Sequence, residues 1–163
     1  MNYKDFTAEI KRRIPKLSYS RQLELSIIIC KKLLPEYQIF SQAYEWGEPK
    51  LLSDAIKKCE QALTVKPNIP ELKTMLPKID KIVPHMDDFG DYMGSYALNA
   101  SASVYETLQF IIDKDATHIF NISTYYTDTI DFKIQEDEDL TEDEIDNHPL
   151  MVEARNFLLG EID

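Results

Sequence analysis

The sequence has little of what builds tight turns, disulfide frameworks or membrane spans. Four of its 163 residues are glycine, two are cysteine, and neither Asn-Gly nor Asp-Gly, the usual hairpin turns, is present. The longest apolar run, Leu25 to Cys30, is much shorter than the roughly 20 residues that cross a bilayer. These absences exclude a small disulfide-bonded scaffold and a membrane-spanning helix, and they argue against a sheet of hairpins.

The cysteines and the N-terminal segment both bear on the cellular compartment. Cys30 and Cys59 lie within apolar helical patterns and are not spaced as CxxC, so we predict two buried, reduced thiols rather than a disulfide or a metal pair. The N-terminal segment is charged and amphipathic, without the apolar centre of a signal peptide. We therefore expect a cytoplasmic protein that does not associate with membranes.

The pattern of apolar residues predicts helices and no strands. Apolar side chains make up 44% of the chain, which is enough for a globular core at this length. They recur three and four residues apart over most of the sequence, which is the spacing of amphipathic helices. The predicted fold class is all-α: a single domain over residues 1–163, formed by a bundle of about seven or eight helices around a central buried helix at about 91–113.

Prolines and capping residues predict where these helices begin and end. A proline lacks the N–H that a helix interior needs, so Pro35 is expected to break or kink the helix that precedes it. Pro77 is expected to kink a later helix or to divide it into two pieces. The predicted helices lie at about 5–13, from Ser18 or Ser20 to 34, at 35–47, from Pro49, from Pro70, at about 91–113, at about 117–134, and from Pro149.

The helix at about 91–113 is predicted to be central because it is apolar on more than one face. Apolar residues form two stripes along it, so no side of the helix is suited to face water alone. Between Ser95 and Ser103 almost every side chain is small, which lets the backbones of neighbouring helices approach closely. Both features place this helix in the middle of the bundle.

The charge of the chain is divided unevenly along its length. Residues 1–81 carry 15 Lys and Arg against 10 Asp and Glu, whereas residues 135–163 carry one Arg against 11 acidic residues. A nucleic-acid ligand is disfavoured, because phosphate binding needs a basic stripe. An acidic surface suits a basic protein partner, and its alternative role is to keep the protein soluble. The candidate partner-binding residues are Glu136, Asp137, Glu138, Asp139, Glu142 and Asp143.

An Asp-rich stretch precedes the central helix and has two interpretations. His85, Asp87, Asp88 and Asp91 bring together the oxygen-rich side chains that hold Mg²⁺, Ca²⁺ or Mn²⁺. Alternatively, Asp87 or Asp88 caps the helix and Asp91 lies in its first turn, where the helix dipole favours a negative charge. If the stretch is a site, its candidate ligand-binding residues are Asp87, Asp88, Asp91, Tyr92, Tyr96 and Asn99. No metal is assigned, and a zinc site lacks a second histidine at helical spacing.

The remaining motifs give no catalytic residue and no cofactor. The stretch from Asp137 to His148 resembles a calcium loop in its first positions, but it lacks the glycine at the sixth position and the glutamate at the twelfth. Thr141 and Glu144 have the spacing of a capping box, which is the interpretation we adopt. Neither a Gly-x-Ser-x-Gly elbow nor a phosphate loop is present. A hydrolase or lyase that uses His118 with the tyrosines is a third hypothesis, and a structural role for His118 is its alternative.

Three long stretches of the sequence resemble one bacterial family. They are "ICKKLLPEYQIFSQAYEWGE", "DDFGDYMGSYALNASASVYETL" and "TEDEIDNHPLMVEARNFLLGEI". These resemble the YjaG-like family, classed as domain of unknown function 416, over about residues 17–162. The resemblance implies an all-α cytoplasmic domain without an assigned activity, and it carries over no catalytic residues.

The function that we expect from the sequence is binding rather than catalysis. The first hypothesis is a non-enzymatic interaction or regulatory module that uses the acidic C-terminal surface. The alternative is a domain that binds a small ligand or a divalent metal through the Asp-rich start of the central helix. The sequence does not indicate an oligomeric state.

Overall fold

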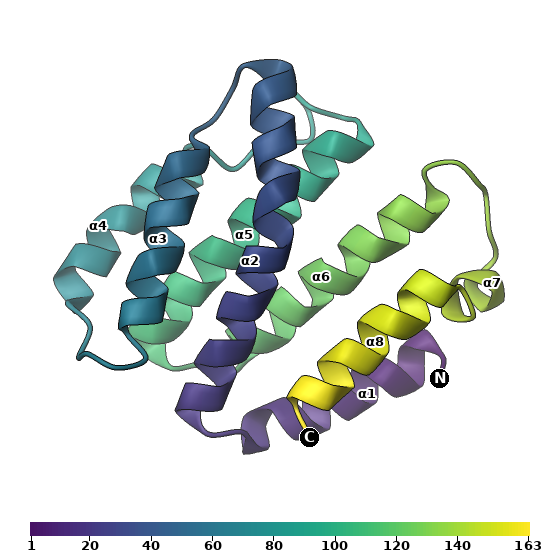
Figure 1. The fold of residues 1–163 in the computed structure, drawn as a ribbon, viewed down its shortest axis with the longest axis horizontal. Coiled ribbons are helices and arrows are strands. Elements are labelled where there is room, and N and C mark those ends of the chain that lie inside the picture. The colour runs from purple at the N-terminus through teal and green to yellow at the C-terminus, as the bar shows by residue number, and fades with distance from the viewer.

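A computed structural model describes residues 1–163 and consists of helices and connecting loops (Figure 1). The prediction of a helical bundle is confirmed, with eight α-helices and one short 3₁₀ helix and no strand. None of the helices combines the length and apolar character that crossing a membrane requires. The elements are α1 (Tyr3–Arg13), η1 (Ile14–Lys16), α2 (Tyr19–Tyr44), α3 (Pro49–Gln61), α4 (Ile69–Asp80), α5 (Tyr92–Asp113), α6 (Thr117–Gln135), α7 (Glu142–Asp146) and α8 (Pro149–Glu161).

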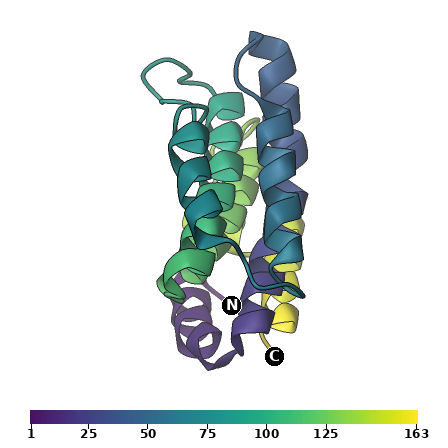
Figure 2. The same ribbon diagram turned by 90° about the vertical axis from the view of Figure 1, so that its left-hand side faces the viewer.

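The central helix of the bundle is α5, as its two apolar stripes predict. It packs against α2, α3, α4 and α6, and α8 packs on α6 on the side away from α3 and α4 (Figure 1). The buried positions of α5 include the small residues Ala97, Ala100, Ser101 and Ser103. Small side chains let the backbones of neighbouring helices approach closely, so four helices can pack around α5. Viewed at right angles, the bundle shows both chain termini at the same end (Figure 2).

The prediction of a helix break at Pro35 is wrong, because α2 runs unbroken from Tyr19 to Tyr44. Pro35 is exposed, so the carbonyl of Lys31, which loses its hydrogen bond to the proline, lies on the exposed side of the helix. Leu33 and Tyr37 on the inner side are fully buried and hold both halves of the helix in the core. The packing of the inner face therefore outweighs the local effect of the proline.

The same argument corrects the prediction that Pro77 divides its helix into two pieces. Pro77 lies inside α4, which is one continuous helix from Ile69 to Asp80. Its side chain is exposed, whereas Leu72 and Ile79 face the core on either side of it. A proline on the outer face of a helix leaves only one carbonyl unbonded, and that carbonyl is open to water.

The end of α2 is fixed to the turn after α4 by one buried tyrosine. The hydroxyl of Tyr37 is fully buried and donates a hydrogen bond of 2.6 Å to the carbonyl of Ile82. Gly47 lies against this hydroxyl, with a φ of +84°, and a Cβ at this position would stand 2.2 Å from the Tyr37 oxygen. Only glycine suits both the backbone conformation and the space.

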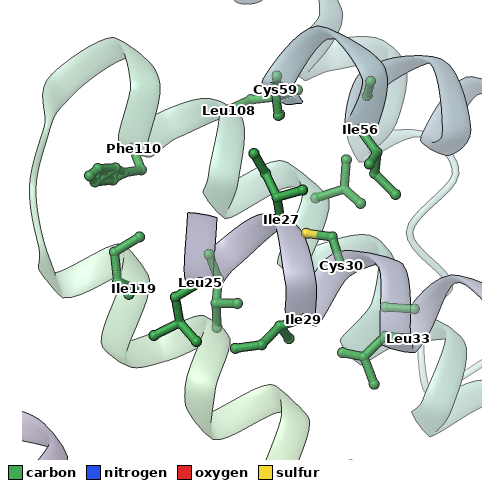
Figure 3. Packing of buried hydrophobic residues seen from close by; sticks show 14 of the residues in the cluster. Leu25, Ile27, Ile29, Cys30, Leu33, Ile56, Cys59, Leu108, Phe110 and Ile119 are labelled. Atoms are coloured by element: carbon green, nitrogen blue, oxygen red, sulfur yellow. The ribbon is translucent and has the colours of Figure 1, made fainter. Parts of the chain in front are cut away.

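The core is one continuous cluster, and both cysteines belong to it (Figure 3). Cys30 and Cys59 are free and buried, which confirms the prediction of reduced thiols. The sulfur of Cys30 lies 3.3 Å from the Thr107 hydroxyl of α5. Burial raises the pKa of Cys30 to about 12, so this thiol stays protonated and behaves as an apolar side chain.

The close packing around α5 predicts that a larger side chain at Ala97 destabilises the protein. Ala97 is fully buried, so Ala97→Leu is expected to lower the free energy of unfolding by about 1–3 kcal/mol through overpacking. Ala43→Leu makes the same change at an exposed position of α2 and is the matched control. Urea denaturation measures both. Equal stability of the two variants contradicts the tight contact.

Candidate functional site

The Asp-rich stretch before α5 caps the helix through Asp91. Its carboxylate accepts a hydrogen bond of 2.9 Å from the Gly94 N–H and another from the Tyr44 hydroxyl. The bond from Tyr44, and to a smaller extent the bond from Gly94, lower the pKa of Asp91. The prediction that Asp87 or Asp88 is the cap is wrong. Both are exposed in a turn that begins at His85.

The later start of the helix has a cause in the core. Phe89 packs edge-on against Phe40, with ring centroids 5.0 Å apart, and contacts Tyr44 and Trp46 as well. Its carbonyl lies so close to Gly94 that a Cβ there would stand 2.1 Å from the oxygen. The anchored ring keeps the residues before it in a turn, and the helix begins after Asp91.

The Asp-rich stretch does not form a metal site in this structure. Asp91 is engaged as the helix cap, while His85, Asp87 and Asp88 are exposed. No three His, Cys, Asp or Glu side chains anywhere in the chain are placed to hold one metal ion together. The four residues that the sequence groups are therefore neighbours along the chain rather than a ligand set.

The two candidate tyrosines connect the start of α5 with the end of α6. Tyr92 and Tyr96 stack with ring centroids 6.4 Å apart. The Tyr92 hydroxyl donates to the carbonyl of Gln135 at 3.3 Å, and the Tyr96 hydroxyl donates to Glu136 at 2.9 Å. Burial, and then the carboxylate of Glu136, raise the pKa of Tyr96. The structure thus joins one predicted ligand residue, Tyr96, to Glu136, the first predicted partner-binding residue.

Asn99 lies deeper along the same helix and is engaged in the interface between α5 and α6. It is buried, and its amide donates a hydrogen bond of 3.1 Å to the Thr129 hydroxyl. Thr129 in turn donates to the carbonyl of Tyr125. A buried amide between two helices needs such a partner, so the pair holds the helices in register.

The acidic side chains that directly follow α6 are exposed. All six candidate partner-binding residues have exposed side chains, four in the loop and two, Glu142 and Asp143, in α7. Thr141 and Glu144 form the predicted capping box, with the Thr141 N–H donating to Glu144 at 2.8 Å. The capping box holds α7 as a single turn of helix that displays its carboxylates.

Glu142 and Asp143 line a cleft that the sequence does not predict, formed by α6, α7, α8 and the N-terminal residues. Its volume is about 530 Å³. We call it the acidic cleft and define it by five carboxylates and two basic side chains: Asp128, Asp131, Glu142, Asp143, Asp146, Lys4 and Arg155. The lining also includes Tyr3, Phe6, Ile145 and Met151.

Arg155 is the buried cation of the acidic cleft. It is 5% exposed, its guanidinium pairs with Asp146 at 2.8 Å, and it donates to the carbonyl of Met1 at 2.8 Å. The guanidinium also lies over the Phe6 ring, 5.4 Å from its centroid. Its Nε atom is buried and has no hydrogen-bond partner. A buried donor without an acceptor is rare and destabilising.

The carboxylates of α6 in the cleft are poorly neutralised. Burial, and then the negative charge of Asp131, raise the pKa of Asp128. Asp128 makes no ion pair, and Asp131 accepts one hydrogen bond of 2.5 Å, from Gln135. The two aspartates stand three apart, so one helix face carries both. This spacing, and a single arginine within the acidic C-terminal third, are the signals by which sequence analysis could have found the cleft.

His118 lies elsewhere, where α5 ends and α6 begins, and bridges two carboxylates. Its Nδ1 is 2.7 Å from Glu106 and its Nε2 is 2.8 Å from Asp113. Glu106 also accepts hydrogen bonds from Asn121 and Tyr125. Both ring nitrogens are occupied, which supports the structural role for His118.

Of the two tyrosines of α6, only Tyr125 lies beside His118, because both contact Glu106. Tyr125 reaches the Glu106 carboxylate at 3.4 Å, whereas Tyr126 packs edge-on against Phe157 of α8, with ring centroids 5.6 Å apart. Tyr92 and Tyr96 lie at the other end of the α5–α6 pair. The residues of the hydrolase or lyase hypothesis are therefore spread over three places.

The fold and this arrangement define an all-α helical bundle with an acidic cleft. Comparison with known proteins identifies its family. The family model of "Protein of unknown function (DUF416)" matches residues 9–160, and the chain belongs to this family. The resemblance seen in the sequence is thereby confirmed for domain of unknown function 416.

The chain is also similar to two individual proteins. An uncharacterized protein of Haemophilus influenzae is 26% identical over 104 residues, which span 63% of this chain and 53% of the relative, about half its length. The crystal structure of a DUF416 family protein from Shewanella baltica is similar with a TM-score of 0.80 and 26% identity. That match covers 93% of this chain and 80% of the Shewanella chain.

The two carboxylates around His118 predict a pH-dependent contribution to stability. Desolvation lowers the pKa of His118, but the hydrogen bonds and charges of Asp113 and Glu106 together raise it above 6.5. The contribution is complete below the unfolded pKa of about 6.5 and is lost as the pH rises through the higher folded value. His118→Gln is expected to cost roughly 1 kcal/mol more at about pH 6 than at about pH 9. Chemical denaturation at both pH values measures this, with the exposed His85→Gln as control.

The burial of Asp128, and then its repulsion by Asp131, predict that neutralising Asp128 stabilises the protein. A folded pKa above the unfolded value means that the charged form is less stable when folded, so stability rises as the pH falls through this range. Asp128 is partly exposed, so solvent screens this effect, and Asp128→Asn is expected to raise the free energy of unfolding at neutral pH by roughly 0.5 kcal/mol. Thermal unfolding compares it with Asp88→Asn, an exposed control. A loss of stability in Asp128→Asn contradicts the assignment.

Proposed function

We propose that the protein is a non-enzymatic binding module that takes a basic protein partner on its acidic C-terminal surface. The observation that supports this most is the acidic cleft, where five carboxylates face only two basic side chains. The exposed residues 136–139 and α7 extend the same charge to the rim. A concave surface of one charge focuses the electrostatic field and attracts a partner of the opposite charge.

Other ligand classes have less support from the same residues. A divalent ion needs its ligands gathered at one point, and the carboxylates of the cleft are not placed that way. Nucleic acid carries the same sign of charge as the segment 135–163. Catalysis by His118 has little support, because both nitrogens of the ring are held by carboxylates.

The alternative function, ligand binding at the start of α5, has less support because its candidate residues already bond to other parts of the chain. The Asp91 carboxylate is already bonded to Gly94 and Tyr44, and Asn99 is buried against Thr129. Asp87 and Asp88 are exposed and free of such contacts. Reversing their charge therefore serves as a control for charge reversal of the acidic C-terminal surface.

The proposal predicts that charge reversal of the C-terminal surface abolishes capture of basic proteins. The test variant changes five exposed carboxylates to lysine and leaves the capping box and the Arg155 pair intact; the residues are Asp137, Glu138, Asp139, Glu142 and Asp143. The matched control makes the same five-charge reversal elsewhere, at Glu45, Glu48, Asp80, Asp87 and Asp88. Pull-down from lysate followed by mass spectrometry compares the proteins recovered.

The expected result is a set of basic proteins that both the native protein and the control retain and the test variant loses. Circular dichroism confirms that each variant is folded. The same set recovered by all three proteins overturns the proposal. Loss from the control alone favours the start of α5 instead.

A further inference from the structure

Hydrogen-bonding groups of both kinds lack partners in the acidic cleft. Arg155 lines the cleft, and its buried Nε is a donor without an acceptor. Asp128, which also lines the cleft, is an acceptor that forms no ion pair, and Asp131 on the same helix face adds a second negative charge. A ligand that supplies both a cationic donor and a neutral acceptor would complement both kinds of group at once.

The spread of the carboxylates sets the shape of that ligand. Asp128 and Asp131 lie on α6, and Glu142 and Asp143 lie on α7, with no three carboxylates close enough to share one metal ion. Two separated positive charges are needed to meet both groups. The cleft is large enough for several side chains, and Phe6 and Met151 in its lining suit the methylene groups of lysine.

We propose that the acidic cleft binds a short peptide segment with two basic side chains. One cation faces Asp128 and Asp131, the other faces Glu142 and Asp143, and a backbone carbonyl faces the guanidinium of Arg155. This inference rests on the proposed function and names the part of the partner that the module recognises. A polyamine would match the carboxylates equally well, but it has no acceptor for the unpaired donor of Arg155. A peptide has backbone carbonyls that can accept from this donor, so Arg155 favours a peptide.

An array of blocked peptides with two lysines at every spacing from adjacent to distant tests the proposal. Fluorescence anisotropy then gives the affinity of the best peptide for the native protein and for two variants that each lose two negative charges. The cleft variant is Asp128→Asn with Asp131→Asn. The control is Glu138→Gln with Asp139→Asn, at exposed positions outside the cleft lining.

The expected result is a loss of about tenfold or more in the cleft variant and little loss in the control. Replacement of both lysines by citrulline is expected to abolish binding. Because Asp128→Asn removes a partly buried charge and its repulsion by Asp131, a folded cleft variant is expected, and thermal unfolding verifies it.

Three outcomes overturn the inference. Equal losses of affinity in the two variants mean that the peptide binds to the general negative charge of the surface rather than to the cleft. This outcome is compatible with the proposed function. Spermidine that binds as tightly as the best peptide assigns the cleft to a small cation. An array with no binding peptide removes the peptide assignment, while the pull-down tests the proposed function independently.

Discussion

The contact of α5 with the helices around it is the constraint on which the rest of the structure depends. Small side chains along α5 let α2 and α6 lie close on either side, and Asn99 bonds to Thr129 across one of these contacts. Since one face of α6 is taken up by α5, its other face is left for α8 and for polar residues. The position of Asp128 and Asp131 in a cleft follows from this division.

After α6 the chain passes through the acidic loop and α7, and α8 then packs on α6. This arrangement forms the cleft. The capping box holds α7 as one turn, and Arg155 of α8 then reaches both Asp146 and the carbonyl of Met1. The first and last parts of the chain are thereby joined at the site (Figure 1). A site formed by residues so far apart in sequence depends on the whole fold.

The helices could be predicted from the sequence because their signals are local. Apolar spacing placed α5 at the centre, and Pro49, Pro149 and the Thr141 capping box marked helix starts. The breaks predicted at Pro35 and Pro77 were wrong, because a proline's effect depends on whether its face is exposed, and that is a tertiary property. Local sequence likewise could not show that Phe89 delays the start of α5.

The candidate site was predicted only in part, for the same reason. The acidic segment stands out in the composition, so Glu142 and Asp143 were found. Asp128, Asp131 and Arg155 were missed, because they come from separate helices and meet only in the folded chain. The Asp-rich stretch before α5 is the opposite case. Its residues are close together in the sequence, but they do not form a metal-binding cluster in the folded chain.

The two buried thiols give the protein a practical property. Burial raises the pKa of Cys30 to about 12 and the pKa of Cys59 well above its ordinary value, so neither sulfur presents a thiolate to reagents in water. A cysteine introduced at the rim of the cleft would then be the only thiol that reacts with a maleimide dye while the protein is folded. The native chain can therefore be labelled at an introduced cysteine without replacing Cys30 and Cys59 first.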